Sequence, residues 1–249
     1  MTQTPRPRLW EIDALRGLAV VAMIFFHFMW DLWFMQLTTQ DIPGPSWQAF
    51  ARSIGGTFTF LLGLSLVLSA ANLRRKGLAP LLPLLKRGLV VFGCGMLVTI
   101  GTYFFVPGEY VRFGILHHAG AAIMIGALLL PLPAWLLLPA GVALTGLGFY
   151  LNTQTVEVPW LIPFGVTQRG VGMVDYYPLL PWFGIALVGM GAGKLLYAEG
   201  QRRFTLPDLS ANRPLAGLRW LGRNSLAVYL VHQPVLIGVM LAGRALGAW

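Results

Sequence analysis

Apolar runs that are each about as long as a bilayer is thick recur along the whole chain. A helix rises about 1.5 Å per residue, so roughly 20 apolar residues cross a hydrocarbon core of about 30 Å. Hydrophobic residues make up 56% of the chain and charged residues only 11%, which excludes an ordinary soluble domain. Because backbone polar groups must be satisfied within lipid, the pattern predicts an all-α, polytopic transmembrane helical bundle.

We expect about seven spans in a single integral-membrane domain that covers residues 1–249. The predicted spans are residues 14–37, 53–71, 89–106, 115–132, 134–151, 179–197 and 218–241. The first run is interpreted as a span and not as a cleaved signal peptide, because Arg16 interrupts it and no small-x-small exit follows.

Lysine and arginine residues are distributed unevenly between the two sides of these spans. Of the 18, all but Arg52, Arg112, Arg169 and Arg244 fall on one side, which the positive-inside rule identifies as the inner side. This bias predicts a multi-pass membrane protein with its N-terminus inside and its C-terminus outside. The net charge of +9 is thereby explained by topology, so we expect the lipid bilayer and not nucleic acid as a partner.

The first span carries ionisable side chains along one face. Asp13, Arg16, His27 and Asp31 fall within an arc of roughly 60° on a helical wheel. Such groups are costly in a bilayer and usually face a bundle interior or a wet cavity, so the stripe is a candidate functional site. Asp31, at i+4 from His27, is expected to hold the imidazole in one tautomer, as a general base requires. The alternative is a polar pair that ties the helix to a neighbour.

The last predicted span carries a second set of polar residues, namely Asn224, Ser225, His232 and Gln233. Asn224, Ser225, Val228 and His232 fall within an arc of roughly 100° if the helix is continuous. Pro234 lacks an N–H group and frees a carbonyl one turn earlier, beside His232. The stripe is interpreted either as part of a functional site or as a proline kink satisfied by its neighbours.

Two further groups of residues are candidates for binding. Arg112, His117 and His118 lie at the outer end of the fourth span and are candidates for contact with a substrate, although Arg112 can equally anchor at the interface. The other group is basic and lies on the inner side, where it fits the phosphates of a cytoplasmic ligand or simply reflects topology and anionic lipid. That group comprises Arg16, Arg74, Arg75, Lys76 and Arg87. The sequence shows no HxxxH, HExxH or CxxC spacing, so no metal site is expected.

Four segments together resemble a known family. They are IDALRGLAVVAMIFFHF (12–28), FTFLLGLSL (58–66), YPLLPWFGIALVGMGAGKLL (177–196) and LRWLGRNSLAVYLVHQPVL (218–236). The chain is similar to short bacterial members of the heparan-alpha-glucosaminide N-acetyltransferase catalytic-domain family, within the transmembrane acyltransferase superfamily. The specific parts of the resemblance are D-x-x-R-G near the start and L-G-x-x-S-x-x-x-Y-x-x-H-x-P near the end.

The resemblance implies a multi-pass protein of the bacterial inner (plasma) membrane that transfers an acyl group across it. The donor would be acetyl-CoA or another acyl-CoA on the inner side, near Arg16 and with Asn224 and Ser225, and the acceptor would be sugar-like or lipid-linked and reach the outer side. His27 matches the catalytic histidine of the superfamily, as a base or as a covalent nucleophile, and His232 matches the closing motif. Asn224, His232 or His117 would donate to the oxyanion. The chain departs from the lysosomal relatives in having no histidine between Phe28 and Leu116.

Three other interpretations of the same residues stay open at this point. A buried histidine and carboxylate also suit a proton-coupled transporter or flippase. His27 and His232 are a candidate pair of axial ligands to haem. A non-catalytic membrane assembly factor would use the polar stripes only for packing. A homodimer is compatible with all of these.

Overall fold

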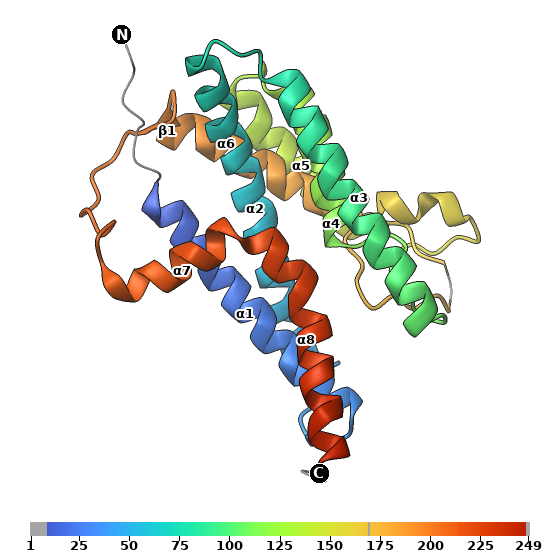
Figure 1. Cartoon of the computed structure of the whole chain (residues 1–249). Helices are drawn as coiled ribbons and strands as arrows, with labels where there is room; N and C mark the ends of the chain where they lie inside the picture. Colours follow the sequence, from blue (N-terminus) through green and yellow to red (C-terminus); the bar gives the residue numbers. More distant parts are fainter. Residues whose placement is uncertain (1–8, 169, 248–249) are drawn as a thin grey trace. The chain divides into compact units, whose positions relative to one another are not determined.

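The computed structural model describes residues 9–168 and 170–247, and most of these are helical (Figure 1). Arg6, Arg8 and Arg169, which contribute to the predicted charge bias, lie outside these residues. The helices are α1 (Trp10–Phe34), α2 (Pro45–Arg75), α3 (Leu81–Phe105), α4 (Ile115–Leu129), α5 (Ala134–Leu151), α6 (Leu179–Leu196), α7 (Arg213–Arg223) and α8 (Ser225–Ala245). A short 3₁₀ helix, η1 (Pro159–Phe164), lies between α5 and α6, and an antiparallel pair, β1 (Tyr197–Ala198) and β2 (Gln201–Arg202), follows α6.

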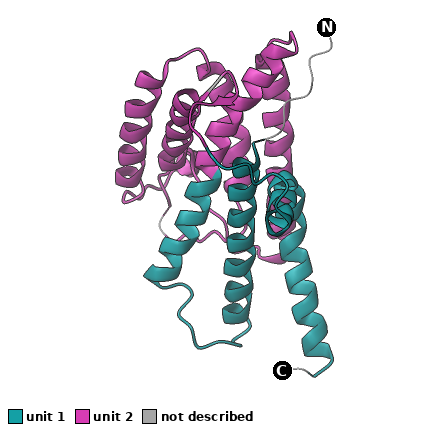
Figure 2. Ribbon diagram, turned by 90° about the vertical axis from the view of Figure 1, so that its left-hand side faces the viewer, with its two compact units in different colours: residues 1–58, 206–249 teal, residues 59–205 magenta. Residues whose placement is uncertain are grey.

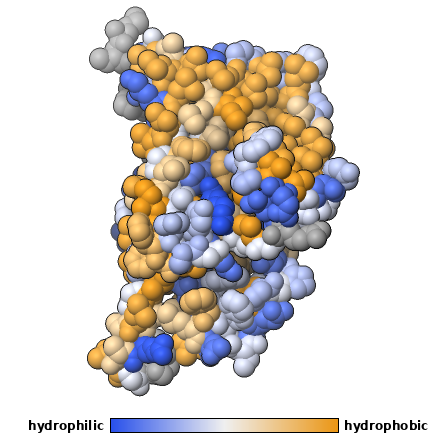
Figure 3. Space-filling model, turned by 90° about the vertical axis from the view of Figure 1, so that its right-hand side faces the viewer, coloured by the Kyte–Doolittle hydropathy of each residue, from blue (hydrophilic) through white to orange (hydrophobic). Residues whose placement is uncertain are grey.

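The predicted fold class, an all-α polytopic membrane bundle, is confirmed. Among the described residues six helices are long and apolar enough to cross a membrane, namely α1, α2, α3, α5, α6 and α8. The predicted span 115–132 corresponds to α4, whose 15 residues extend only about 22 Å. Figure 3 shows that apolar side chains cover much of the visible face, as contact with lipid requires. The orientation of the two ends stays a prediction.

The predicted seventh span is wrong in its first part, because the chain breaks at Asn224. α7 ends at Arg223 and α8 begins at Ser225, and Figure 1 shows the sharp turn between them. Asn224 leaves the helical region (φ −105°, ψ 19°) and its side-chain amide donates to the carbonyl of Trp220 at 2.9 Å. Asparagine competes in this way with backbone hydrogen bonds, which explains the break. Consequently Asn224 and His232 do not share one continuous helical face.

The chain packs as two compact units (Figure 2), each of which is described by itself. Unit 1 joins residues 1–58 to residues 206–249 and so contains α1, the start of α2, α7 and α8. Its core is built on Val20, Met23 and Ile54. α7 lies directly on α1: a Cβ at Gly17 would overlap the backbone of Leu218, and one at Gly222 would overlap the carbonyl of Asp13. Small residues at these two positions permit the close approach of the helices.

Unit 2 comprises residues 59–205 and holds the rest of α2 together with α3 to α6. Glycines again allow backbones to touch, since a Cβ at Gly63 would overlap the carbonyl of Ala186. The two long loops of this unit are hydrogen-bonded to each other. The amide of Val174 donates to the carbonyl of Glu109 at 2.9 Å, and that of Tyr177 donates to the carbonyl of Phe113 at 3.0 Å. The loop between α5 and α6 is therefore an ordered connector.

Candidate functional site

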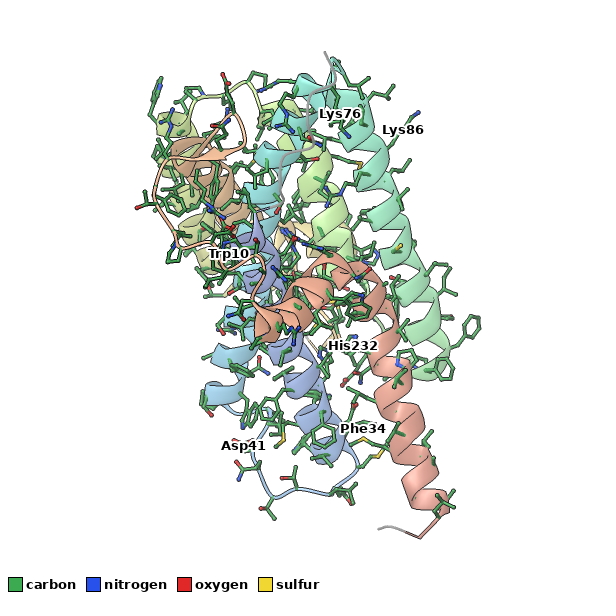
Figure 4. All side chains as sticks on the ribbon, turned by 60° about the vertical axis from the view of Figure 1, so that its left-hand side comes forward. Trp10, Phe34, Asp41, Lys76, Lys86 and His232 are labelled. Atoms are coloured by element: carbon green, nitrogen blue, oxygen red, sulfur yellow. The ribbon has the colours of Figure 1, made fainter. Side chains whose placement is uncertain are left out.

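Two histidines from opposite ends of the chain meet inside unit 1. His27 lies on α1 and His232 on α8, and their imidazole rings are in edge contact, with centroids 4.8 Å apart and planes at 81°. Figure 4 shows His232 on α8 beside α1. His232 is buried, with 8% of its surface exposed. The arrangement also argues against a haem held between these two residues, because a porphyrin would have to occupy the space in which the rings touch.

Each ring is held by a carbonyl of its own helix. His27 Nδ1 lies 2.9 Å from the carbonyl oxygen of Met23, and His232 Nδ1 lies 2.7 Å from that of Tyr229. Because a carbonyl oxygen only accepts hydrogen bonds, Nδ1 of each ring must carry a proton and donate it. In the neutral imidazole the Nε2 atom then has a lone pair and no proton. Both rings are thus in the tautomer in which Nε2 can accept a proton.

Asp31 does not orient His27 as the i+4 spacing suggests. Among the described residues it forms no hydrogen bond with His27, whose Nδ1 is used by Met23. Its Oδ1 accepts instead from the side-chain amide of Gln233 at 2.7 Å. Asp31 is 5% exposed, so this pair is buried on the same two helices as the histidines. Gln233, a member of the polar stripe of the last predicted span, is thus the hydrogen-bond partner of Asp31.

At the N-terminal end of α1, residues of the D-x-x-R-G motif contact residues of the L-G-x-x-S-x-x-x-Y-x-x-H-x-P motif. The carboxylate of Asp13 lies 2.9 Å from Arg223 Nε and 3.5 Å from Arg16 Nη1. Arg16 Nη1 also donates to the carbonyl oxygen of Gly222 at 3.4 Å. Asp13, Arg16 and Gly17 belong to the opening motif, and Gly222 and Arg223 to the closing one. The guanidinium group of Arg16 is therefore positioned by Asp13 and Gly222. Arg223 is a second cationic partner of Asp13, which the sequence did not identify.

Asn224 and Ser225 lie at the corner between α7 and α8. The amide of Val228 donates to the carbonyl of Asn224 at 3.0 Å, which begins α8. Since the side chain of Asn224 is turned back onto Trp220, its described contacts stabilise the corner. The corner lies close along the chain to Arg223, at the end of unit 1 where the two motifs interlock.

The basic residues of the α2–α3 turn belong to unit 2. Arg74, Arg75 and Lys76 are exposed at the end of α2, and Arg87 is exposed near the start of α3. Figure 4 shows Lys76 and Lys86 at this turn. Arg75 donates to the side-chain oxygen of Asn72 at 2.9 Å, and within the described chain these cations form no ion pair. The expected phosphate-binding set is thus divided between the units, with Arg16 in unit 1.

The histidines of α4 are buried in unit 2. His117 is 2% exposed and uses both ring nitrogens: Nδ1 accepts from the amide of Gly114 at 3.2 Å, and Nε2 lies 3.3 Å from Thr99 Oγ1. Thr99 in turn donates to the carbonyl of Val111 at 2.7 Å, and this chain of contacts closes the turn that leads into α4. His118 has no exposed surface. Contact of either histidine with a substrate stays a prediction.

Arg112 and Tyr176 are polar residues that make contacts within the loops of unit 2. Arg112 donates to the carbonyl of Gly172 at 3.1 Å and stacks 4.2 Å from the centre of the Tyr110 ring, so it joins the two loops. The Tyr176 hydroxyl donates to the carbonyl of Ile162 at 2.8 Å. Burial raises the pKa of Tyr176 above its ordinary value.

Comparison with known proteins places the chain in a family. A family model described as heparan-alpha-glucosaminide N-acetyltransferase, catalytic, matches residues 8–234. The match includes both interlocked motifs and both histidines of unit 1. Searches of the curated proteins and of the solved structures found no match. Since the family model covers most of the 249 residues, the chain belongs to the heparan-alpha-glucosaminide N-acetyltransferase catalytic family of transmembrane acyltransferases.

Proposed function

We propose that this protein transfers an acyl group, with acetyl the expected case, from acyl-CoA on the cytoplasmic side to a sugar-like or lipid-linked acceptor on the other side of the membrane. Family membership supports the reaction class, and the paired histidines supply a site that can carry it out. The observation that carries the proposal is the unprotonated Nε2 of both rings inside a helical membrane protein. The proton-coupled transporter is not favoured, because the matching family is described as an acetyltransferase.

His27 acts as the general base in this proposal. Its Nε2 takes the proton of the acceptor hydroxyl or amine as that atom attacks the acyl carbon of the thioester. The new bond to the acyl carbon forms, the carbon–sulfur bond breaks, and CoA leaves as a thiolate. The proton then passes from the His27 imidazolium to the thiolate sulfur, which regenerates the neutral ring. General-base catalysis of this kind contributes roughly 10²- to 10⁴-fold in rate.

His232 serves as a second proton acceptor and not as an oxyanion donor. Its N–H proton is already donated to Tyr229, so the neutral ring has no hydrogen left to stabilise an oxyanion. Since the His232 ring is in contact with that of His27, we propose that it can take up the proton during the transfer. Asp31 belongs to the same buried cluster through Gln233.

The exposed cations of the α2–α3 turn fit a polyanionic donor such as CoA. Arg74, Arg75 and Lys76 form no described ion pair, and guanidinium groups bind phosphate through paired hydrogen bonds. In unit 1, Arg16 and Arg223 converge on Asp13, which brings two guanidinium groups to one place. Asn224 and Ser225 flank them. The α2–α3 turn and this unit 1 cluster are thus two separate candidate sites for the phosphates of CoA.

Purified protein tests the proposal directly. Acetyl-CoA and D-glucosamine are incubated with wild-type protein and with His27→Ala, and release of the CoA thiol and the mass of the acetylated sugar are measured. We expect turnover in the wild type and a loss of about 10² to 10⁴ in H27A. Asp41→Asn is the control, because Asp41 is an exposed residue of the loop after α1 to which no part in the reaction is assigned. Wild-type turnover by H27A would remove His27 from the mechanism. A rise in the thermal midpoint on addition of acetyl-CoA measures binding of the donor independently of turnover.

A further inference from the structure

Three buried acceptor atoms on the helices that carry the histidine pair have no hydrogen-bond donor in the described part of the chain. Among the described residues Asp31 Oδ2, Gln233 Oε1 and His232 Nε2 have no partner. All three lie on α1 and α8 in unit 1, on side chains that otherwise make ordered contacts. Buried polar atoms in folded proteins are nearly always paired, so a concentration of unpaired ones requires a physical explanation.

The unpaired atoms share one chemical character. The side-chain NH₂ of Gln233 donates to Asp31 Oδ1, so Oε1 of Gln233 is left as an acceptor. The proton of His232 is used on Tyr229, so Nε2 is an acceptor as well. These three atoms are therefore all acceptors. A molecule that brings O–H or N–H groups can satisfy them.

We infer that Asp31 and Gln233 form a specificity-determining subsite that accepts a hydrogen bond from a hydroxyl group of the acceptor molecule, next to the atom that His27 deprotonates. This inference rests on the proposed function. Asp31 follows His27 by one helical turn, which separates the two positions by about 6 Å along α1. The subsite is thus close enough to the base for one ring-sized polyhydroxylated molecule to engage both. The class of acceptor is a polyol or sugar, and a substrate without the hydroxyl leaves the acceptors unpaired.

The Asp31–Gln233 hydrogen bond makes the subsite rigid. Donation by Gln233 to Oδ1 fixes the carboxylate plane and so determines where Oδ2 points. Sites built to bind a hydroxyl reject the analogue that lacks it by on the order of 10⁴ because their polar groups stay unpaired. An apolar pair at these positions would give no such discrimination. The two residues act as positioning and specificity groups and take no part in the proton transfer.

The test pairs deletion of one hydroxyl in the substrate with removal of its partner in the protein. The probes are D-glucosamine and its 3-deoxy, 4-deoxy and 6-deoxy analogues, which keep the amine, with acetyl-CoA as donor. The proteins are wild type, Asp31→Asn and Gln233→Met. Asp41→Asn is the matched control, because Asp41 is an exposed carboxylate in the loop after α1 (Figure 4). Both kcat/KM and the thermal stabilisation by each sugar are measured.

We expect the wild type and D41N to lose about 10²-fold or more in kcat/KM with one of the deoxy analogues. D31N and Q233M should treat that analogue and D-glucosamine alike, to within about threefold, since the partner of the hydroxyl is already gone. Equal discrimination by D31N and wild type across all analogues overturns the inference while the proposed function stands. If no protein acetylates these sugars but wild type is stabilised selectively by D-glucosamine and D31N is not, the proposed reaction fails and the subsite stands. No selective stabilisation and no turnover overturns both.

Discussion

The imidazole rings of His27 and His232 touch in unit 1, although they lie near opposite ends of the sequence, and each ring donates its Nδ1 proton to its own helix. In the proposed mechanism the two touching rings act together as one proton-accepting pair. Replacement of either histidine therefore removes its own Nε2 and also the ring against which the other histidine packs.

His232→Ala is expected to lower turnover by about 10- to 100-fold, less than H27A. The double variant should be close to H27A alone, because residues that act as one unit have non-additive effects. The turnover of H27A, H232A and the double variant is measured by steady-state release of the CoA thiol from acetyl-CoA. Independent, multiplicative losses would show that the two rings do not share the proton.

Asp13→Asn should destabilise the protein by about 1 to 3 kcal/mol, because it removes the charge that both Arg16 and Arg223 contact in a partly buried position. Arg223→Gln should cost less, since the Arg223 side chain is 44% exposed and its ion pair is weakened by solvent. The midpoints of thermal unfolding in detergent show which of the two variants is less stable. A more stable D13N than R223Q would contradict the central place of Asp13 in this network.

Gly222→Ala and Gly17→Ala should each destabilise unit 1 by about 1 to 3 kcal/mol or more, because the new methyl group meets the backbone of the facing helix. Gly238→Ala in α8 is the control, since a methyl group there would meet nothing within 4 Å, and alanine favours helix at that position. The yield of folded protein and its thermal midpoint are compared. Equal effects at Gly222 and Gly238 would show that α7 and α1 are not in close contact.

We expect the buried Tyr176 phenol to make the free energy of unfolding depend on pH in the alkaline range. Its pKa is raised in the folded protein by burial, so the unfolded chain loses the phenol proton first as pH rises. The free energy of unfolding contributed by Tyr176 is therefore fully present below the ordinary tyrosine pKa of about 10 and decreases above it. Thermal midpoints measured between about pH 8 and pH 11 should fall more for wild type than for Tyr176→Phe, which does not titrate. Parallel curves would exclude a buried phenol at this position.

The helices are largely predictable because length and composition alone identify a membrane span. The break at Asn224 is not, because a hydropathy window averages over one polar residue while the local amide-to-carbonyl hydrogen bond decides the backbone. The two histidines are identifiable as candidates from their cost in a bilayer. The predicted orientation of His27 is wrong: spacing allows Asp31 as its partner, but the carbonyl of Met23 lies within the same helix and is always available.

The partners of the site residues lie beyond sequence reasoning for a different reason. Gln233 meets Asp31 across 202 positions and Arg223 meets Asp13 across 210. Such pairings depend on which helices pack together, and helical periodicity describes only a single helix. The acceptor character of the cluster likewise depends on where each proton lies in three dimensions.

The union of residues 1–58 with residues 206–249 has a consequence for biosynthesis. During translation α1 leaves the ribosome long before α7 and α8 exist, so Asp13, Asp31 and His27 enter the translocon as an isolated polar stripe. Their counterparts arrive only when synthesis is nearly finished. A chain released any earlier would have every helix of unit 2 but only the α1 half of the histidine pair, so synthesis of α7 and α8 is the step that completes the proposed site.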